Sequence, residues 1–131
     1  MARPEEELQL SICNYLKLQY PKAIFLSESS GLRVSMGQAK KLKRMRSFDA
    51  LPDMFIAFPN GKYHGMFIEL KTTESSPYLK DGSISTQKHV QEQLQTLKKL
   101  HDLGYAAVFG VGFEDTRSKI DNYFSLPKLN P

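Results

Sequence analysis

Residues 52–72 read PDMFIAFPNGKYHGMFIELKT, and this stretch decides the fold. Two apolar runs, 53–58 and 64–72, are separated by a Pro-Asn-Gly-Lys turn at 59–62. An Asn-Gly pair between two apolar runs is one of the strongest short-range signals for a β-hairpin. The stretch therefore predicts two antiparallel strands in the middle of the chain.

The segments on either side of the hairpin alternate between helix and strand patterns. Pro4 followed by three glutamates suits the first turn of a helix, and Gly104 suits the end of a long one. Residues 28–37 and 73–83 read as loops, the second of them mobile. The expected helices are 5–19, 38–45, 85–103 with Ser85 as N-cap, and one capped by Asp115; the expected strands are 23–27, 53–58, 64–72 and 105–111. The order α-β-α-β-β-α-β-α predicts an α/β domain with a mixed central sheet flanked by helices.

Three charged residues gather at one end of the predicted hairpin. Glu69 and Lys71 are two residues apart in a strand, so they point to the same face. Pairing across the Asn-Gly turn brings Asp53 towards them. Carboxylates of this kind bind Mg²⁺, and a lysine beside them can orient a water or neutralise developing charge. The arrangement favours metal-assisted phosphodiester cleavage; ordinary charge alternation on a half-exposed strand is the alternative.

Length and composition bound the possibilities. The chain has 131 residues, of which 40% are hydrophobic and 24% charged, which fits a single globular domain over 1–131 and excludes a mainly disordered chain or a fibre. One cysteine, Cys13, excludes a disulfide scaffold. No apolar run approaches a membrane span, and no phosphate-binding or dinucleotide fingerprint is present. We expect a soluble cytoplasmic protein without a nucleotide cofactor.

The positive charge is local. The chain has 18 Lys and Arg against 14 Asp and Glu, a net charge of +4. Residues 33–46 hold six basic residues and no acidic one, so the rest of the chain is slightly acidic. Such a segment is either a solvated helix face or a patch that contacts phosphates. The candidates for phosphate contact are Arg33, Lys40, Lys41, Lys43, Arg44 and Arg46.

Several short strings together resemble a known family. Residues 52–53 (PD) followed by 69–71 (ELK) resemble the signature of the PD-(D/E)xK nucleases. Other strings narrow the resemblance to the VRR-Nuc group (virus-type replication-repair nuclease) in its small stand-alone, phage-like form. These are GMFIELK at 65–71, ISTQ at 84–87, LGY at 103–105, and Glu5 four residues before Gln9. Ala50 replaces a usual glycine, and the 73–83 loop is longer than usual; neither departure removes a catalytic group.

The resemblance implies roles for individual residues and a restriction-endonuclease-like fold. Asp53 and Glu69 would be metal ligands for Mg²⁺ or Mn²⁺, helped by the backbone carbonyl of Leu70. Lys71 would be the catalytic lysine and Gln87 an additional active-site residue at the start of the next helix. The first helix would supply one more acid; Glu5 fits best, although Glu6 and Glu7 remain open.

The function that follows from the resemblance is a metal-dependent, structure-selective DNA endonuclease. The stand-alone family members imply a homodimer that acts on branched DNA such as four-way (Holliday) junctions, and a two-fold dimer would supply two active sites for symmetric cleavage. A non-catalytic DNA-binding module on the same fold is the alternative, and a small-molecule α/β domain is the third possibility. Nothing in the sequence indicates readout of base edges, so we expect recognition of backbone and shape.

Overall fold

The computed structural model describes residues 3–28, 35–48 and 50–128, and it has the predicted order of elements. Four strands form one sheet in the order β1-β2-β3-β4. They are β1 (Ile24–Ser27), β2 (Met54–Ala57), β3 (Met66–Lys71) and β4 (Ala106–Val111). The pairs β1–β2 and β2–β3 are antiparallel and β3–β4 is parallel, so the sheet is mixed, as predicted.

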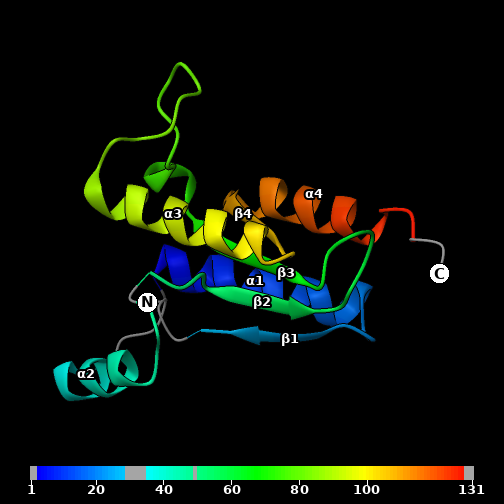
Figure 1. The fold of residues 1–131 in the computed structure, drawn as a ribbon, viewed down its shortest axis with the longest axis horizontal. Coiled ribbons are helices and arrows are strands. Elements are labelled where there is room, and N and C mark those ends of the chain that lie inside the picture. The colour runs from blue at the N-terminus through cyan, green and yellow to red at the C-terminus, as the bar shows by residue number, and fades with distance from the viewer. Residues whose placement is uncertain (1–2, 29–34, 49, 129–131) are drawn as a thin grey trace.

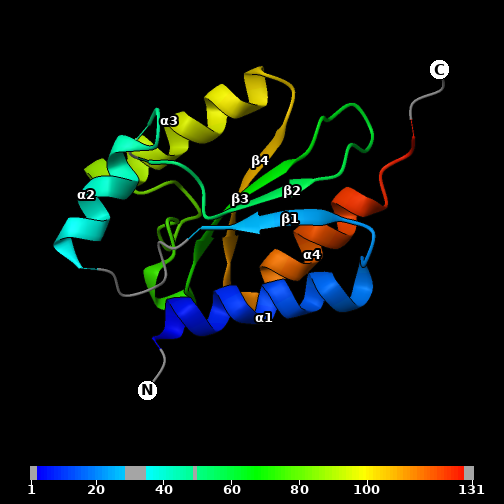
Figure 2. The ribbon, with the colours of Figure 1, turned by 90° about the horizontal axis from the view of Figure 1, so that it is seen from below.

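Helices cover the two faces of the sheet unequally. Helices α1 (Pro4–Gln19) and α4 (Gly112–Phe124) lie on one face, and α3 (Lys88–Asp102) lies on the other (Figure 2). The remaining helix, α2 (Met36–Arg44), stands at the end of the molecule where α1 begins (Figure 1). None of its residues is buried.

The main core lies between the sheet and the α1/α4 layer. Alternate residues of the central hairpin point into it, because side chains along a strand point to opposite faces. The fully buried members come from the hairpin and from both helices: Ile12, Leu16, Met54, Ile56, Met66, Ile68, Ile120 and Tyr123. A smaller cluster of Val90, Leu97 and Phe109 joins α3 to the other face. The hairpin is therefore held by apolar packing mainly on one side.

The predicted turn closes the hairpin and is tied to the end of α4. Asn60 and Tyr63 form an isolated antiparallel bridge, and Gly61 adopts a positive φ of 57°. The side-chain amide of Asn60 donates to the backbone carbonyl of Tyr123 at 2.8 Å. The turn therefore fixes both the register of the hairpin and the position of the last helix.

Three local predictions are wrong. Ser85 is not an N-cap, because α3 begins at Lys88 with Gln87 as its N-cap; the buried Ser85 instead donates its backbone N–H to Pro77 at 2.7 Å. Asp115 does not precede the last helix; it lies in its first turn and accepts a hydrogen bond from the backbone N–H of Val111. The basic helix begins at Met36, because Ser35 and Gln38 form a capping box ahead of the predicted start.

The 73–83 loop carries local structure of its own. It contains a 3₁₀ turn at Thr73–Ser75, and Tyr78 forms an isolated bridge with Ile84.

Among the described residues, no helix is long and apolar enough to cross a membrane.

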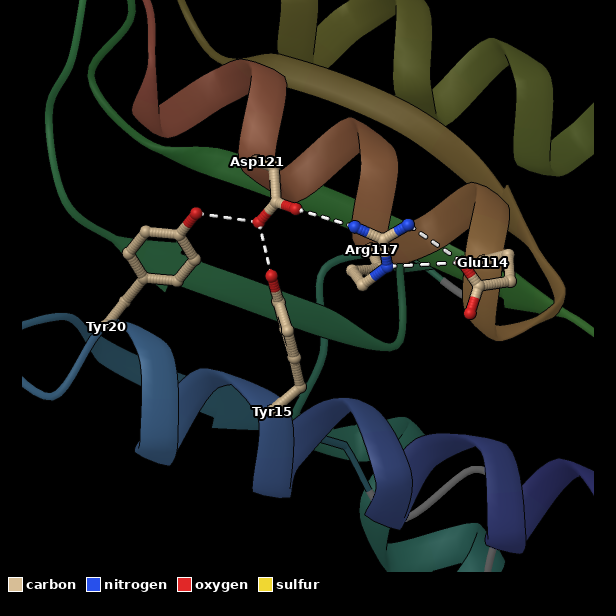
Figure 3. Close-up of polar contacts among 5 residues, drawn as sticks. All are labelled: Tyr15, Tyr20, Glu114, Arg117 and Asp121. Atoms are coloured by element: carbon tan, nitrogen blue, oxygen red, sulfur yellow. Dashed lines mark hydrogen bonds and ion pairs between the residues drawn. The ribbon is translucent and has the colours of Figure 1, made fainter.

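A polar cluster joins α1 to α4 on the outer side of the core (Figure 3). The carboxylate of Asp121 accepts hydrogen bonds from the hydroxyls of Tyr15 at 2.6 Å and Tyr20 at 2.7 Å. Its second oxygen accepts from Arg117 at 3.0 Å. Burial alone would raise the pKa of Asp121, but the two hydroxyls and the Arg117 charge outweigh it and hold this pKa below its ordinary value.

We expect Asp121→Asn to lower the free energy of unfolding by about 2 kcal/mol near neutral pH, since a charged acceptor of three hydrogen bonds is lost. A carboxylate with a lowered pKa in the folded state stabilises the protein above its unfolded pKa, and this contribution is lost as pH falls through the folded value. The difference between wild type and variant should therefore shrink under acid. Denaturant titrations between pH 2.5 and 7 would measure this, with the exposed Asp102→Asn as control. An unchanged free energy at pH 7 would contradict the expectation.

Candidate active site

The register of the hairpin brings Asp53 and Glu69 together. Met54 pairs with Ile68, so continuing the register by one residue places Asp53 opposite Glu69 on the same face. The backbone N–H of Leu70 donates to Asp53 Oδ2 at 2.7 Å, which fixes the carboxylate against β3. The two acids that the sequence predicts as metal ligands therefore lie beside each other.

These residues line one cavity at the end of the sheet. Its volume is about 660 Å³, and its lining residues come from the places where β2 begins, β3 ends and both α1 and α3 begin. Every residue assigned from the sequence to catalysis or metal binding lines it: Glu5, Asp53, Glu69, Leu70, Lys71 and Gln87. Of the three N-terminal glutamates, Glu5 lines the cavity, whereas Glu6 and Glu7 are not among its lining residues.

The surroundings of Glu69 disfavour its ionised form. The residue is only 7% exposed. Burial raises the pKa of Glu69 to about 9, the neighbouring charge of Asp53 adds to this shift, and Lys71 opposes it. Within the described part of the chain, Glu69 Oε2 is buried without a hydrogen-bond partner. A buried carboxylate left in this condition is costly, which is typical of a functional site.

A divalent cation fits this donor set. It would satisfy the buried Oε2 of Glu69 and relieve the repulsion between Glu69 and Asp53. The described residues hold no cluster of three or more His, Cys, Asp or Glu side chains suited to a metal. Two carboxylates are nevertheless enough for Mg²⁺, which keeps several of its waters.

Gln93 is a site residue that the sequence analysis missed. Its side-chain Nε2 donates to Glu69 Oε1 at 2.9 Å, whereas Gln87 is an exposed residue of the cavity lining. Gln93 lies three residues after the buried Val90 and four before the buried Leu97, so it is on the inward face of α3. A polar residue interrupting an apolar helix face was the available signal.

Helix α2, which carries most of the basic segment, stands at the same end of the molecule as the cavity (Figure 1). Lys40, Lys41, Lys43 and Arg44 are exposed on α2. Arg46 differs, because its side chain is 19% exposed and forms an ion pair with Glu28 at 2.6 Å. Arg33 lies outside the described residues.

Comparison with known proteins agrees with this geometry. A solved structure described as a "VRR_NUC domain protein" matches the chain with a TM-score of 0.67 and 25% sequence identity. The match covers 99% of this chain and 95% of that one. This chain has the VRR_NUC fold. No family model and no curated protein matches it. The resemblance predicted from the sequence is thus confirmed at the level of structure, and the VRR_NUC fold implies a nuclease.

We expect Gln93→Leu to lower the cleavage rate about tenfold, because the leucine removes a hydrogen bond to the buried Glu69 carboxylate and leaves that carboxylate less well oriented. Single-turnover cleavage assays on this variant and on the exposed control Gln95→Leu would measure the effect. Gln87→Leu, assayed in parallel, shows whether an exposed residue of the cavity lining affects the cleavage rate as strongly. Equal rates for Gln93→Leu and Gln95→Leu would contradict the expected role of Gln93.

Proposed function

We propose that this protein is a metal-dependent DNA endonuclease whose active site is the cavity around Asp53, Glu69 and Lys71. The observation that carries the proposal is the pairing of Asp53 with Glu69 across the hairpin, with one buried Glu69 oxygen left without a partner among the described residues. The VRR_NUC fold supports the same class of reaction. Phosphodiester hydrolysis needs charge neutralisation and an oriented water, and these residues suit both needs.

The metal would be Mg²⁺ or Mn²⁺, held by Asp53, Glu69 and the backbone carbonyl of Leu70. When bound, it would lower the pKa of a coordinated water and stabilise the charge that develops on the phosphate. Asp53 is already oriented for binding, because the Leu70 N–H holds one of its oxygens. Gln93 orients Glu69 in the same way.

The other residues of the cavity act on the substrate and on its attacking water. Lys71 shares the strand face of Glu69, so its ammonium can orient that water or neutralise charge on the phosphate. Glu5 and Gln87 line the cavity from two different elements, at the beginning of α1 and just before α3. They are placed to contact the DNA backbone or the water as the strand enters. The expected product carries a 5′-phosphate.

The substrate we favour is branched DNA, including four-way junctions, cut by a homodimer. Each chain offers one such cavity, and symmetric cuts in two strands need two cavities related by a two-fold axis. The exposed cations of α2 bind phosphates without reading base edges, which suits recognition of DNA shape.

The decisive experiment incubates the purified protein with a labelled four-way junction, a flap and a linear duplex. Each is tested with Mg²⁺, Mn²⁺ or a chelator. Metal-dependent products on the junction support the proposal in full. Products on all substrates support the nuclease alone. Salt-sensitive binding without cleavage would favour a non-catalytic DNA-binding module, and neither binding nor cleavage would reject both.

We expect Glu69→Gln to abolish metal-dependent cleavage while raising the midpoint of thermal unfolding in chelator. The amide keeps the shape of the side chain but removes the cost of holding an ionisable carboxyl buried beside Asp53, where its pKa is raised to about 9, so the metal-free fold gains stability. Lys71→Ala should also abolish cleavage and leave DNA binding mostly intact. Cleavage rates, binding by fluorescence anisotropy and thermal melts would be compared. Wild-type cleavage by either variant would contradict the assignment of the site.

We expect replacement of Lys40, Lys41, Lys43 and Arg44 by glutamine to weaken binding to every DNA substrate by a similar factor. Each lost phosphate contact should reduce the slope of log affinity against log salt by about 1. The single-turnover cleavage rate at saturating protein should stay close to wild type, because none of these side chains lines the cavity. Lys98, which is exposed on α3, provides a matched charge-neutralising control. An unchanged salt slope would contradict phosphate contact by α2.

A further inference from the structure

Arg46 differs from the exposed cations of α2, because its guanidinium is already paired with a carboxylate. Its guanidinium donates to Glu28 Oε2 at 2.6 Å, and its side chain is 19% exposed. Its backbone N–H donates to the carbonyl of Lys43 at 3.3 Å, which attaches Arg46 to the last turn of α2. A guanidinium already held by a carboxylate has less capacity left for a phosphate. Arg46 therefore joins α2 to Glu28.

Glu28 is in turn joined to the active site. Its backbone N–H donates to the carbonyl of Asp53 at 2.6 Å. Ser27 pairs with Met54, so continuing the register by one residue puts Glu28 opposite Asp53, on the same face. The side-chain amide of Gln9 in α1 donates to the Glu28 carbonyl at 2.5 Å. Glu28 is therefore fixed by backbone contacts next to a proposed metal ligand.

Helix α2 needs such an attachment. None of its residues is buried, and Met36 in its first turn and Met45 at its C-cap are each 79% exposed. Apolar packing is what usually fixes the orientation of a helix on a domain. Where packing is absent, a partly buried charge-assisted hydrogen bond can do so.

We infer that Glu28 and Arg46 are positioning residues that hold the basic helix α2 beside the Asp53/Glu69 cavity. Phosphates bound on α2 then place the neighbouring phosphodiester at the cavity. The inference rests on the proposed nuclease function and adds a specific determinant of how DNA is seated. Neither residue contacts the reacting phosphate, so the pair acts on KM and leaves kcat unchanged.

Three roles for this pair give different outcomes for Glu28→Gln. If the pair positions α2, KM rises about tenfold, the size of one charge-assisted hydrogen bond, and kcat stays within about twofold. If Arg46 instead contacts a phosphate directly, loss of a repelling carboxylate and release of Arg46 lower KM. If Glu28 is a third metal ligand beside Asp53, kcat falls and the metal requirement rises.

The experiment measures KM and kcat with Mg²⁺ on the best-cut DNA substrate for Glu28→Gln, Arg46→Gln and the double variant. For a positioning pair, each single variant raises KM to a similar extent and the double variant is no worse than either, because both remove the same contact. Glu92→Gln is the matched control: it neutralises a glutamate paired with Lys88 at 3.9 Å within α3, so it should not raise KM.

Two further variants guard against trivial explanations. Arg46→Lys keeps the charge and one donor, so it should recover part of the KM lost in Arg46→Gln. The double variant that exchanges the two residues, Glu28→Arg with Arg46→Glu, should have a lower KM than either of these single substitutions. Thermal melts establish that the variants fold, and if Glu28→Gln does not, the comparison of Arg46→Gln with Arg46→Lys decides.

The outcomes separate this inference from the proposed function. No metal-dependent cleavage by the wild type overturns the proposed function. Cleavage by the wild type, with additive effects of the two substitutions, a lower KM for Glu28→Gln, or a main effect on kcat, overturns the positioning role alone.

Discussion

The antiparallel register of β2 on β3 is the constraint on which the site depends. It sets Asp53 opposite Glu69 and leaves two carboxylates side by side in the lining of a cavity. The side-chain period of a strand is two, so a slip of one residue would turn one partner to the other face and dismantle the pair. Burial and this proximity raise the pKa of Glu69 to about 9. The register therefore creates the site and its instability together.

Packing on the opposite face offsets that instability. Met54, Ile56 and Ile68 alternate with the site residues along the same two strands and are buried against α1 and α4. Slipping the register would expose these side chains, at a cost of roughly 2 kcal/mol each. The Asn60 turn and the Asp121 cluster then hold the outer layer in place. The acids can be held side by side because a different register would lose the packing of the strands that carry them.

The sequence supported the prediction of the hairpin, the order of elements and the residues that meet in the cavity, because these follow from local signals. Asn60-Gly61 defines the turn, and strand alternation places Glu69 and Lys71 on one face. The errors fall where long-range contacts decide. The buried Ser85 bonds to Pro77 in the preceding loop, so α3 starts later than its local pattern suggests. Gln93 acquires its role only by meeting a strand 24 residues away.

Arg46 is another residue whose role is decided by a long-range contact and not by the local sequence. In the sequence Arg46 lies in the same basic segment as Lys43 and Arg44. Its ion-pair partner Glu28, however, is 18 residues earlier and comes just after β1. The acids proposed to hold the metal are fixed by a packed sheet, whereas the cations proposed to contact DNA lie on a helix with no buried residue. Binding through exposed charges weakens as salt rises, but the strand register does not depend on salt. For the proposed nuclease, ionic strength should therefore act on how DNA is bound and oriented by α2, while the geometry of the cavity depends on the hairpin register.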